Sequence, residues 1–93
     1  MKHVKCYDNG GSTVDRYTVV FTDMPERSGL FTCLGMSDQP FHPQGFSQHS
    51  MAALGRHLGK RIAYAALPQD CRRAVMQSRL QQAYVIRKAE ARA

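Results

Sequence analysis

Apolar and polar residues alternate over the first third of the chain, which is the spacing of a β-strand with one buried face. Between Thr13 and Phe21 the odd and even positions form the two faces of a predicted strand. The residues expected to share its inner face are Tyr17, Val19 and Phe21. Asp8–Gly11 precedes it and is a strong turn signal, because Asn and Gly adopt positive φ at little cost. With Val4–Tyr7 before the turn, the pattern predicts a β-hairpin.

Further strands are predicted after this hairpin. A second turn, Asp23–Gly29, leads into a third strand, Leu30–Leu34, so the hairpin extends to a meander. Ser50 is then predicted to cap a short helical turn over Met51–Leu58, which Gly59 would end. A short strand is predicted over residues 61–64.

The spacing changes to that of a helix from Pro68 to about Ala89, where good helix formers follow one another without Gly or Pro. At 100° per residue, the apolar residues fall on two nearly opposite sides. The side expected to cover the sheet holds Cys71, Ala74, Val75, Val85, Ile86 and Ala89. The other side holds Met76, Leu80, Ala83 and Tyr84. A second apolar stripe implies deep burial, a bend in the helix, or a partner that covers it.

These elements predict a single α+β domain over residues 1–93. A small antiparallel sheet of three or four strands would pack against the long C-terminal helix. The expected order is a meander over 1–34, a long ordered loop with a helical turn over 35–59, a strand over 60–66 and the helix over 68–89. The composition, 43% hydrophobic and 22% charged, is typical of a globular protein. Without a long apolar run or an apolar N-terminal region, we expect no membrane span, no secretory signal and a cytoplasmic location.

The segment Met36–Ser50 carries two prolines, two histidines and two phenylalanines without any periodic pattern. Long irregular segments in compact domains are usually functional or disordered, and the aromatic residues argue against disorder. Its side chains are expected either to contact a partner or to anchor the loop on the core. The candidates for partner contact are Phe41, His42, Gln44, Phe46 and His49.

The net charge of +6 is unevenly distributed along the chain. Residues 1–50 carry four Lys and Arg against five Asp and Glu, and residues 51–93 carry nine against two. A basic half favours an anionic partner such as nucleic acid, although it is also typical of a solvated helix face. The candidates for phosphate contact are Arg56, Lys60, Arg61, Arg72, Arg73 and Arg79. No DNA- or RNA-binding signature accompanies them.

Catalytic and metal chemistry have little support in the sequence. The three cysteines are far apart and are expected to be buried free thiols. His42, His49 and His57 are separated by seven and eight residues, which matches no compact pair of zinc ligands. No cofactor, metal or catalytic residue is therefore assigned. A small metal-dependent or Cys–His hydrolase is the last of the alternatives.

Four motifs stand out between residue 7 and about residue 75. They are Tyr7–Gly11, Asp15–Phe21, Leu34–Ser37 with Pro40–Phe46, and Leu58–Ile62 running into Leu67 and Pro68. In these motifs the chain resembles a group of small uncharacterised proteins encoded by bacteriophages and other bacterial mobile elements. The resemblance implies a bacterial host cell as the setting, and it carries over no activity and no site residue.

Together these patterns predict a small non-enzymatic binding protein. A protein partner, for which the chain would act as an accessory or an inhibitor, comes first because nucleic acid would not cover an apolar helix stripe. The central loop and the stripe of Met76, Leu80 and Tyr84 are the expected contact surfaces. Nucleic-acid binding by the basic half is the main alternative, and a homodimer through the helix is a further one.

Overall fold

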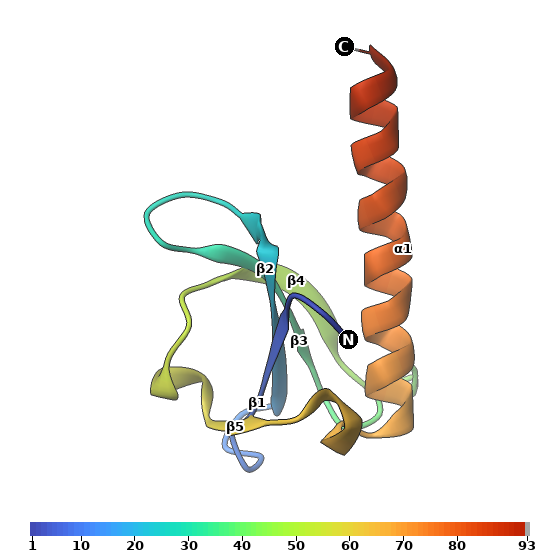
Figure 1. Cartoon of the computed structure of the whole chain (residues 1–93). Helices are drawn as coiled ribbons and strands as arrows, with labels where there is room; N and C mark the ends of the chain where they lie inside the picture. The colour runs from blue at the N-terminus through green and yellow to red at the C-terminus, as the bar shows by residue number, and fades with distance from the viewer. Residues whose placement is uncertain (93) are drawn as a thin grey trace.

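The computed structural model describes the backbone of residues 1–92 and the side chains of residues 1–84 (Figure 1). Five strands form one antiparallel sheet in the order β4-β3-β2-β1-β5. The strands are β1 (Val4–Asp8), β2 (Tyr17–Pro25), β3 (Phe31–Met36), β4 (Ser47–Ala52) and β5 (Lys60–Ile62). The other elements are the 3-10 turns η1 (Arg56–Leu58) and η2 (Tyr64–Ala66) and the helix α1 (Gln69–Arg92). The α+β class is confirmed, with five strands in place of three or four.

The predicted hairpin is present as β1 and β2, which pair from Val4 opposite Phe21 to Asp8 opposite Tyr17. The second strand begins and ends later than expected. Residues 9–16 are a longer connection, and β2 continues through the predicted second turn to Pro25. β2 then pairs with β3, with a register irregularity between Val20 and Pro25.

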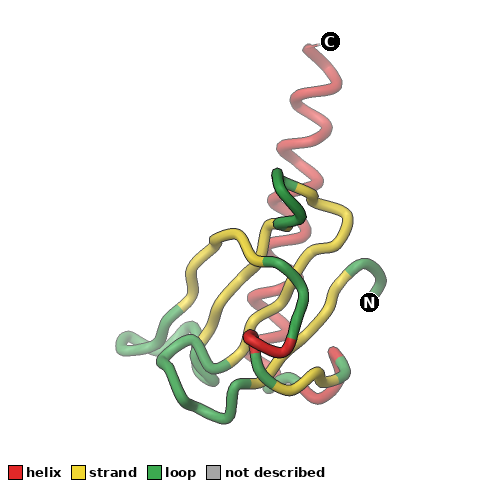
Figure 2. Tube along the Cα trace, turned by 90° about the vertical axis from the view of Figure 1, so that its left-hand side faces the viewer, coloured by secondary structure: helices red, strands yellow, loops and turns green. Residues whose placement is uncertain are grey.

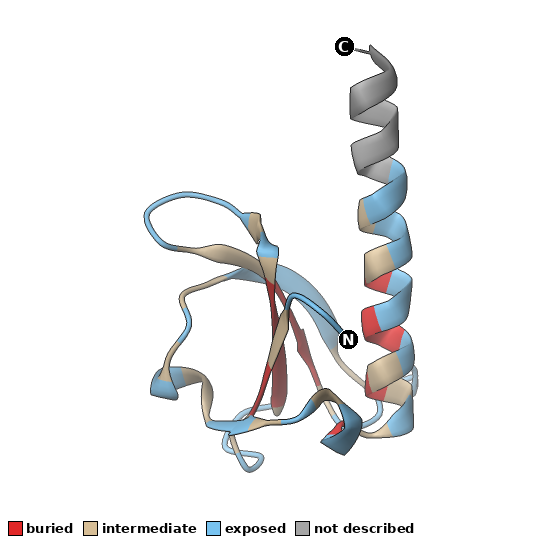
Figure 3. Ribbon diagram, in the orientation of Figure 1, coloured by how far each residue is buried: buried red, intermediate tan, exposed pale blue. Residues whose placement is uncertain are grey.

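The main core lies between the sheet and α1, on one face of β2 (Figure 3). The alternation predicted for β2 is confirmed, because Tyr17, Val19 and Phe21 all face this core. Fully buried side chains of this size contribute about 1.5–3 kcal/mol each. α1 contributes Cys71, Ala74 and Val75 to this core. These residues belong to the side of the helix that was expected to cover the sheet, which the structure describes as far as residue 84. No helix among residues 1–92 has the length and apolar character needed to cross a bilayer.

A smaller cluster lies on the opposite face of the sheet, around Tyr7, Val20 and Cys33. β4 and β5 are the two edge strands, so the connection between them has to cross this face (Figure 2). Leu58 of η1 packs on the cluster as the chain crosses. All three cysteines are free and buried, as predicted.

The prediction of a helical turn over Met51–Leu58 capped by Ser50 is wrong. Residues 47–52 are strand β4, which pairs along the whole of β3. Every residue of β4 except Ala52 is exposed, so the strand has no alternation of buried and exposed side chains that a sequence pattern could reveal. Only the three residues of η1 are helical, and Gly59 ends that turn, as predicted.

The irregular central segment is shorter than expected and comprises residues 37–46. Its two ends are joined, because the Ser37 amide donates to the Phe46 carbonyl (2.9 Å) and the Phe46 amide donates to the Ser37 hydroxyl (2.9 Å). The thiol of Cys71 in α1 donates to the Ser37 carbonyl (3.3 Å). A Cβ at Gly45 would lie 2.0 Å from the Gln39 carbonyl oxygen, so only glycine fits there. These contacts hold the loop against the start of α1.

Candidate binding surfaces

The side of α1 that faces the sheet, its inner side, is buried. Cys71, Ala74, Val75 and Ser78 are each at most 6% exposed, and they lie within one sector of the helix. This sector is the one predicted to cover the sheet. The residues predicted to continue it, Val85, Ile86 and Ala89, lie outside the described side chains.

The opposite side of α1 carries large apolar side chains in solvent. Met76, Leu80 and Tyr84 are 54%, 70% and 63% exposed. They are four residues apart, so they form a row about 12 Å long on one helix face, which we call the outer stripe. α1 runs well past the edge of the sheet (Figure 1), and Met76 and Leu80 stay more than half exposed within the described chain.

One residue of the central loop joins the start of the outer stripe. The Arg73 guanidinium lies 5.0 Å from the centre of the Phe41 ring and also pairs with Asp70 at 3.2 Å. Arg73 lies on the same helix face as Leu80 and precedes Met76 by less than one turn. Phe41 remains 45% exposed. The structure therefore brings Phe41 close to the beginning of the stripe.

The other loop candidates have local roles. The Gln44 amide donates to Nδ1 of His42 at 3.1 Å, within an exposed turn. Phe46 is half-buried, and its backbone closes the loop. His49 lies on β4, where its Nε2 is 3.0 Å from the Ser78 hydroxyl and so links this edge strand to the inner side of α1. These four residues do not gather into one surface with the outer stripe.

The six predicted phosphate contacts divide into two groups. On α1, Arg79 is occupied by the fold, because its guanidinium pairs with Asp23 at 2.8 Å and lies over the Phe21 ring at 4.9 Å. Arg72 reaches the Ala65 carbonyl at 3.5 Å, and Arg73 is held by Phe41 and Asp70 as described. The expected row of arginines along the helix is therefore engaged within the chain. The remaining group is Arg56, Lys60 and Arg61, which come together on η1 and β5.

Two of these cations, Arg56 and Lys60, border a recess of about 540 Å³ at the end of the sheet, which we call the basic recess. One wall is the β1–β2 connection and the other is the segment around η1 and the start of β5. The residues that line it are Asp8, Asn9, Gly10, Ser12, Arg56, His57, Gly59 and Lys60. A neighbouring recess of about 510 Å³ shares Arg56, Gly59 and Lys60 and adds Tyr7, Gly55 and Arg61.

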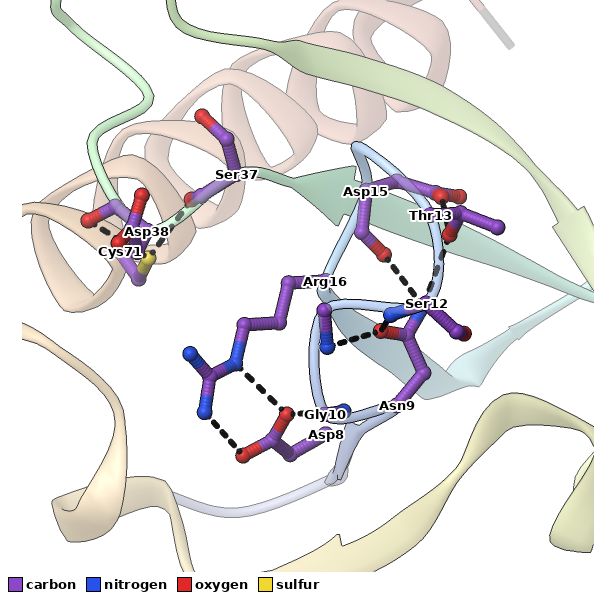
Figure 4. A network of polar contacts seen from close by, with 11 residues as sticks. Asp8, Asn9, Gly10, Ser12, Thr13, Asp15, Arg16, Ser37, Asp38 and Cys71 are labelled. Atoms are coloured by element: carbon purple, nitrogen blue, oxygen red, sulfur yellow. Dashed lines mark hydrogen bonds and ion pairs between the residues drawn. The ribbon is translucent and has the colours of Figure 1, made fainter.

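The Asn9 side chain builds the first wall of the basic recess (Figure 4). Its Oδ1 accepts hydrogen bonds from the amides of Gly11 (2.9 Å) and Ser12 (3.1 Å). Its Nδ2 donates to the Thr13 hydroxyl (2.9 Å) and to the Asp15 carbonyl (3.2 Å). One amide side chain thus satisfies four backbone or side-chain groups of the connection, which fixes the shape of this wall.

The one carboxylate that lines the recess, Asp8, already accepts three hydrogen bonds within the chain. Asp8 accepts from Arg16 through Nε (2.9 Å) and Nη2 (3.2 Å), and from the Gly10 amide (2.8 Å). The Arg16 hydrogen bond, followed by the Gly10 amide, lowers the pKa of Asp8 below its usual value. No ion pair joins Arg56, Lys60 or Arg61 to a carboxylate among the side chains of residues 1–84.

The buried thiols are poor nucleophiles. Burial raises the pKa of both Cys6 and Cys71 to about 11, so each is a neutral thiol at neutral pH. Cys33 is buried beside the Ser50 hydroxyl at 3.2 Å. Within the described residues, no group of three or more His, Cys, Asp and Glu side chains is placed to hold a metal ion. The three histidines weighed as ligands lie on the central loop, on β4 and on η1.

Comparison of the chain with protein families, with curated proteins and with solved structures finds no match. The function has to be argued from the two surfaces themselves. The outer stripe was visible in the helix periodicity. The wall formed by Asn9 and Ser12 was missed, because only the pairing of β1 with β5 brings it beside the basic residues.

Proposed function

We propose that this chain is a small non-enzymatic binding protein that contacts another protein through the outer stripe of α1. Met76 and Leu80 carry the proposal, because two large apolar side chains more than half exposed on one helix face have no cover in the described chain. Burying such a side chain contributes about 1.5–3 kcal/mol. The setting, the cytoplasm of a bacterium that hosts a phage or mobile element, rests on the motifs of residues 7–75.

The geometry fits a helix that docks into an apolar groove of the partner. In that mode of recognition, anchors on one helix face enter successive pockets of the groove. The outer stripe offers anchors at positions i, i+4 and i+8, and the exposed Phe41 ring at its start would extend the contact. α1 also projects from the sheet (Figure 1), so the partner can reach the stripe without moving the core. The chain would then act as an accessory or an inhibitor of that partner.

Two rival functions have weaker support. Nucleic acid would contact cations, and it would leave the outer stripe in water. A Cys–His hydrolase would need a reactive thiolate, whereas Cys6 and Cys71 are neutral buried thiols. Both rivals leave the apolar helix face unexplained.

The test compares Leu80→Glu with Gln81→Glu, which places the same charge on the next exposed position of α1. Each tagged variant and the wild type are used to capture partners from a nuclease-treated host lysate. Each is also measured alone by light scattering at high concentration. We expect a stoichiometric protein partner that Leu80→Glu loses and Gln81→Glu retains, and a wild type that is a monomer of 10.5 kDa.

Two results would contradict the proposal. A wild-type dimer that Leu80→Glu returns to a monomer would mean that a second copy covers the stripe. A partner captured equally by both variants would mean that the stripe is not the contact surface. Because Leu80 and Gln81 are both exposed, we expect the two variants to keep the fold, which circular dichroism of each checks.

A further inference from the structure

We infer that the basic recess binds a phosphate group, with Arg56 and Lys60 as its charge partners. The site lies at the end of the sheet, between the β1–β2 connection and η1. Both segments lie away from α1 (Figure 1). It is therefore separate from the surface assigned to the protein partner. The ligand class is a phosphate ester, either a free nucleotide-like compound or the backbone of a nucleic-acid strand.

Gly59 lets the chain turn back against β1 after η1, and Gly55 leaves room for the His57 ring at the start of η1. A Cβ at Gly59 would lie 2.5 Å from the Asp8 carbonyl oxygen, and Gly59 has a φ of +114° that other residues rarely adopt. A Cβ at Gly55 would lie 2.9 Å from Nδ1 of His57. The close approach at Gly59 places Lys60 directly opposite Asp8 in the β1–β5 ladder. Arg56 and Lys60 thereby reach the same recess.

The charge in the recess is unbalanced. Asp8 is held by two hydrogen bonds from Arg16 and one from the Gly10 amide, so its charge is already compensated. Neither Arg56 nor Lys60 forms an ion pair with a carboxylate among residues 1–84, and Lys60, opposite Asp8, adds a smaller contribution to the lowered pKa of that carboxyl. Two cations that border one open recess outside any ion pair attract an anion and can hold it through charge-assisted hydrogen bonds.

Phosphate fits this site better than a single carboxylate does. Arg presents several donors in a planar fork and Lys a point charge, which together suit the several oxygens of a phosphate. Ser12 adds a hydroxyl on the facing wall, and His57 adds a ring nitrogen. The recess of about 540 Å³ is open to solvent, so the rest of a phosphate ester can extend out of it.

The experiment uses the full chain labelled with nitrogen-15, at low salt. Amide shifts are followed by NMR during titrations with inorganic phosphate, ADP, a short single-stranded DNA and a glutamate peptide of matched charge. We expect saturable shifts that centre on Asn9–Ser12 and Gly55–Arg61. We also expect Arg56→Gln and Lys60→Gln each to weaken binding roughly tenfold or more.

The matched control is Arg27→Gln, which removes the same charge from an exposed turn at the β2–β3 connection. It should leave the affinity for phosphate and ADP nearly unchanged. Arg56, Lys60 and Arg27 are all exposed, so the three variants should remain folded, and their dispersed spectra check this.

The titrations also distinguish the source of the phosphate. ADP that binds at least as tightly as the DNA indicates a free phosphate compound. DNA that binds much more tightly, with an affinity that falls steeply as salt rises, indicates a strand backbone. The inference is overturned if no phosphate ligand shifts these amides or if the glutamate peptide binds as tightly as phosphate. It is also overturned if Arg56→Gln and Lys60→Gln bind as Arg27→Gln does.

Discussion

At the scale of single residues, Gly59 decides whether β5 can join the sheet. Gly59→Ala would force a Cβ to within 2.5 Å of the Asp8 carbonyl oxygen at a φ of +114°. We expect a loss of about 2–4 kcal/mol in the free energy of unfolding, from overpacking and backbone strain together. Gly29→Ala is the control, because Gly29 has a positive φ of +77° but open space around its Cα. It should cost about 1–2 kcal/mol. Equal losses in urea unfolding would show that the close approach is unimportant.

Asp8 makes the stability of the fold depend on pH. Its pKa is lower in the folded state than in the unfolded chain, where an Asp titrates near 3.9. The stabilisation is therefore fully present above about pH 4 and is lost as the pH falls through the lower folded pKa. We expect Asp8→Asn to lower the urea midpoint at pH 7, and the difference from wild type to shrink as the pH falls below about 4.

A double-mutant cycle identifies the cause of this pH dependence. Since Arg16 is the largest contributor to the lowered pKa of Asp8, Arg16→Gln should remove most of the effect of Asp8→Asn at pH 7. Additive effects of the two substitutions would show instead that the Gly10 amide and the backbone geometry matter more than the ion pair.

At the scale of elements, the two apolar sides of α1 have different roles: one packs in the core and the other faces solvent. Val75 is fully buried in the core, and Met76, its neighbour in sequence, is 54% exposed. We expect Val75→Ala to lower the free energy of unfolding by about 2 kcal/mol, from lost burial and the cavity left behind. Met76→Ala should change it by less than about 0.5 kcal/mol. Urea unfolding at several protein concentrations provides the measurement. A large, concentration-dependent cost for Met76→Ala would place the outer stripe in a dimer interface.

The elements that the sequence predicts correctly are those with a buried face. β2 alternates because one of its faces meets α1, and α1 shows its inner side because Cys71, Ala74 and Val75 recur at helical spacing. β4 has no such signal. Its residues are almost all exposed, and it is a strand because its backbone pairs with β3. Local preference at Ser50 suggests a helix cap, and this long-range pairing overrides it.

The candidate surfaces differ in the same way. The outer stripe lies within one helix, so periodicity alone finds it. The basic recess combines residues about fifty positions apart, and only the β1–β5 register brings them together. The sequence placed Arg79 among the phosphate contacts because its charge is visible, whereas its pairing with Asp23 and its position over Phe21 depend on the packing of α1 on the sheet.

At the scale of the whole molecule, the two charge halves are interleaved in space. On α1, Arg79 pairs with Asp23 of the first half, and Arg73 lies over the ring of Phe41, also of the first half. Arg56 and Lys60, at the end of the sheet away from α1, form no ion pair with a carboxylate among residues 1–84. The apolar outer stripe on α1 and the cationic recess at the end of the sheet thus lie apart, and each can be occupied without disturbing the other.

This arrangement predicts that a ligand in the basic recess stabilises the entire fold. The recess joins the β1–β2 connection to the start of β5, and these walls exist together only in the folded chain. A ligand that binds only the folded state adds about 2.7 kcal/mol at a hundred times its Kd. For a domain of this size, that raises Tm by roughly 10–20 °C.

Thermal unfolding should show this rise with phosphate or ADP, and much less with chloride at equal ionic strength. Lys60→Gln should reduce the shift at the same ligand concentration, and Leu80→Glu should leave it unchanged, because Leu80 lies on α1, away from the recess. An equal rise in chloride would mean that general salt screening of the +6 charge, and not a site, stabilises the protein.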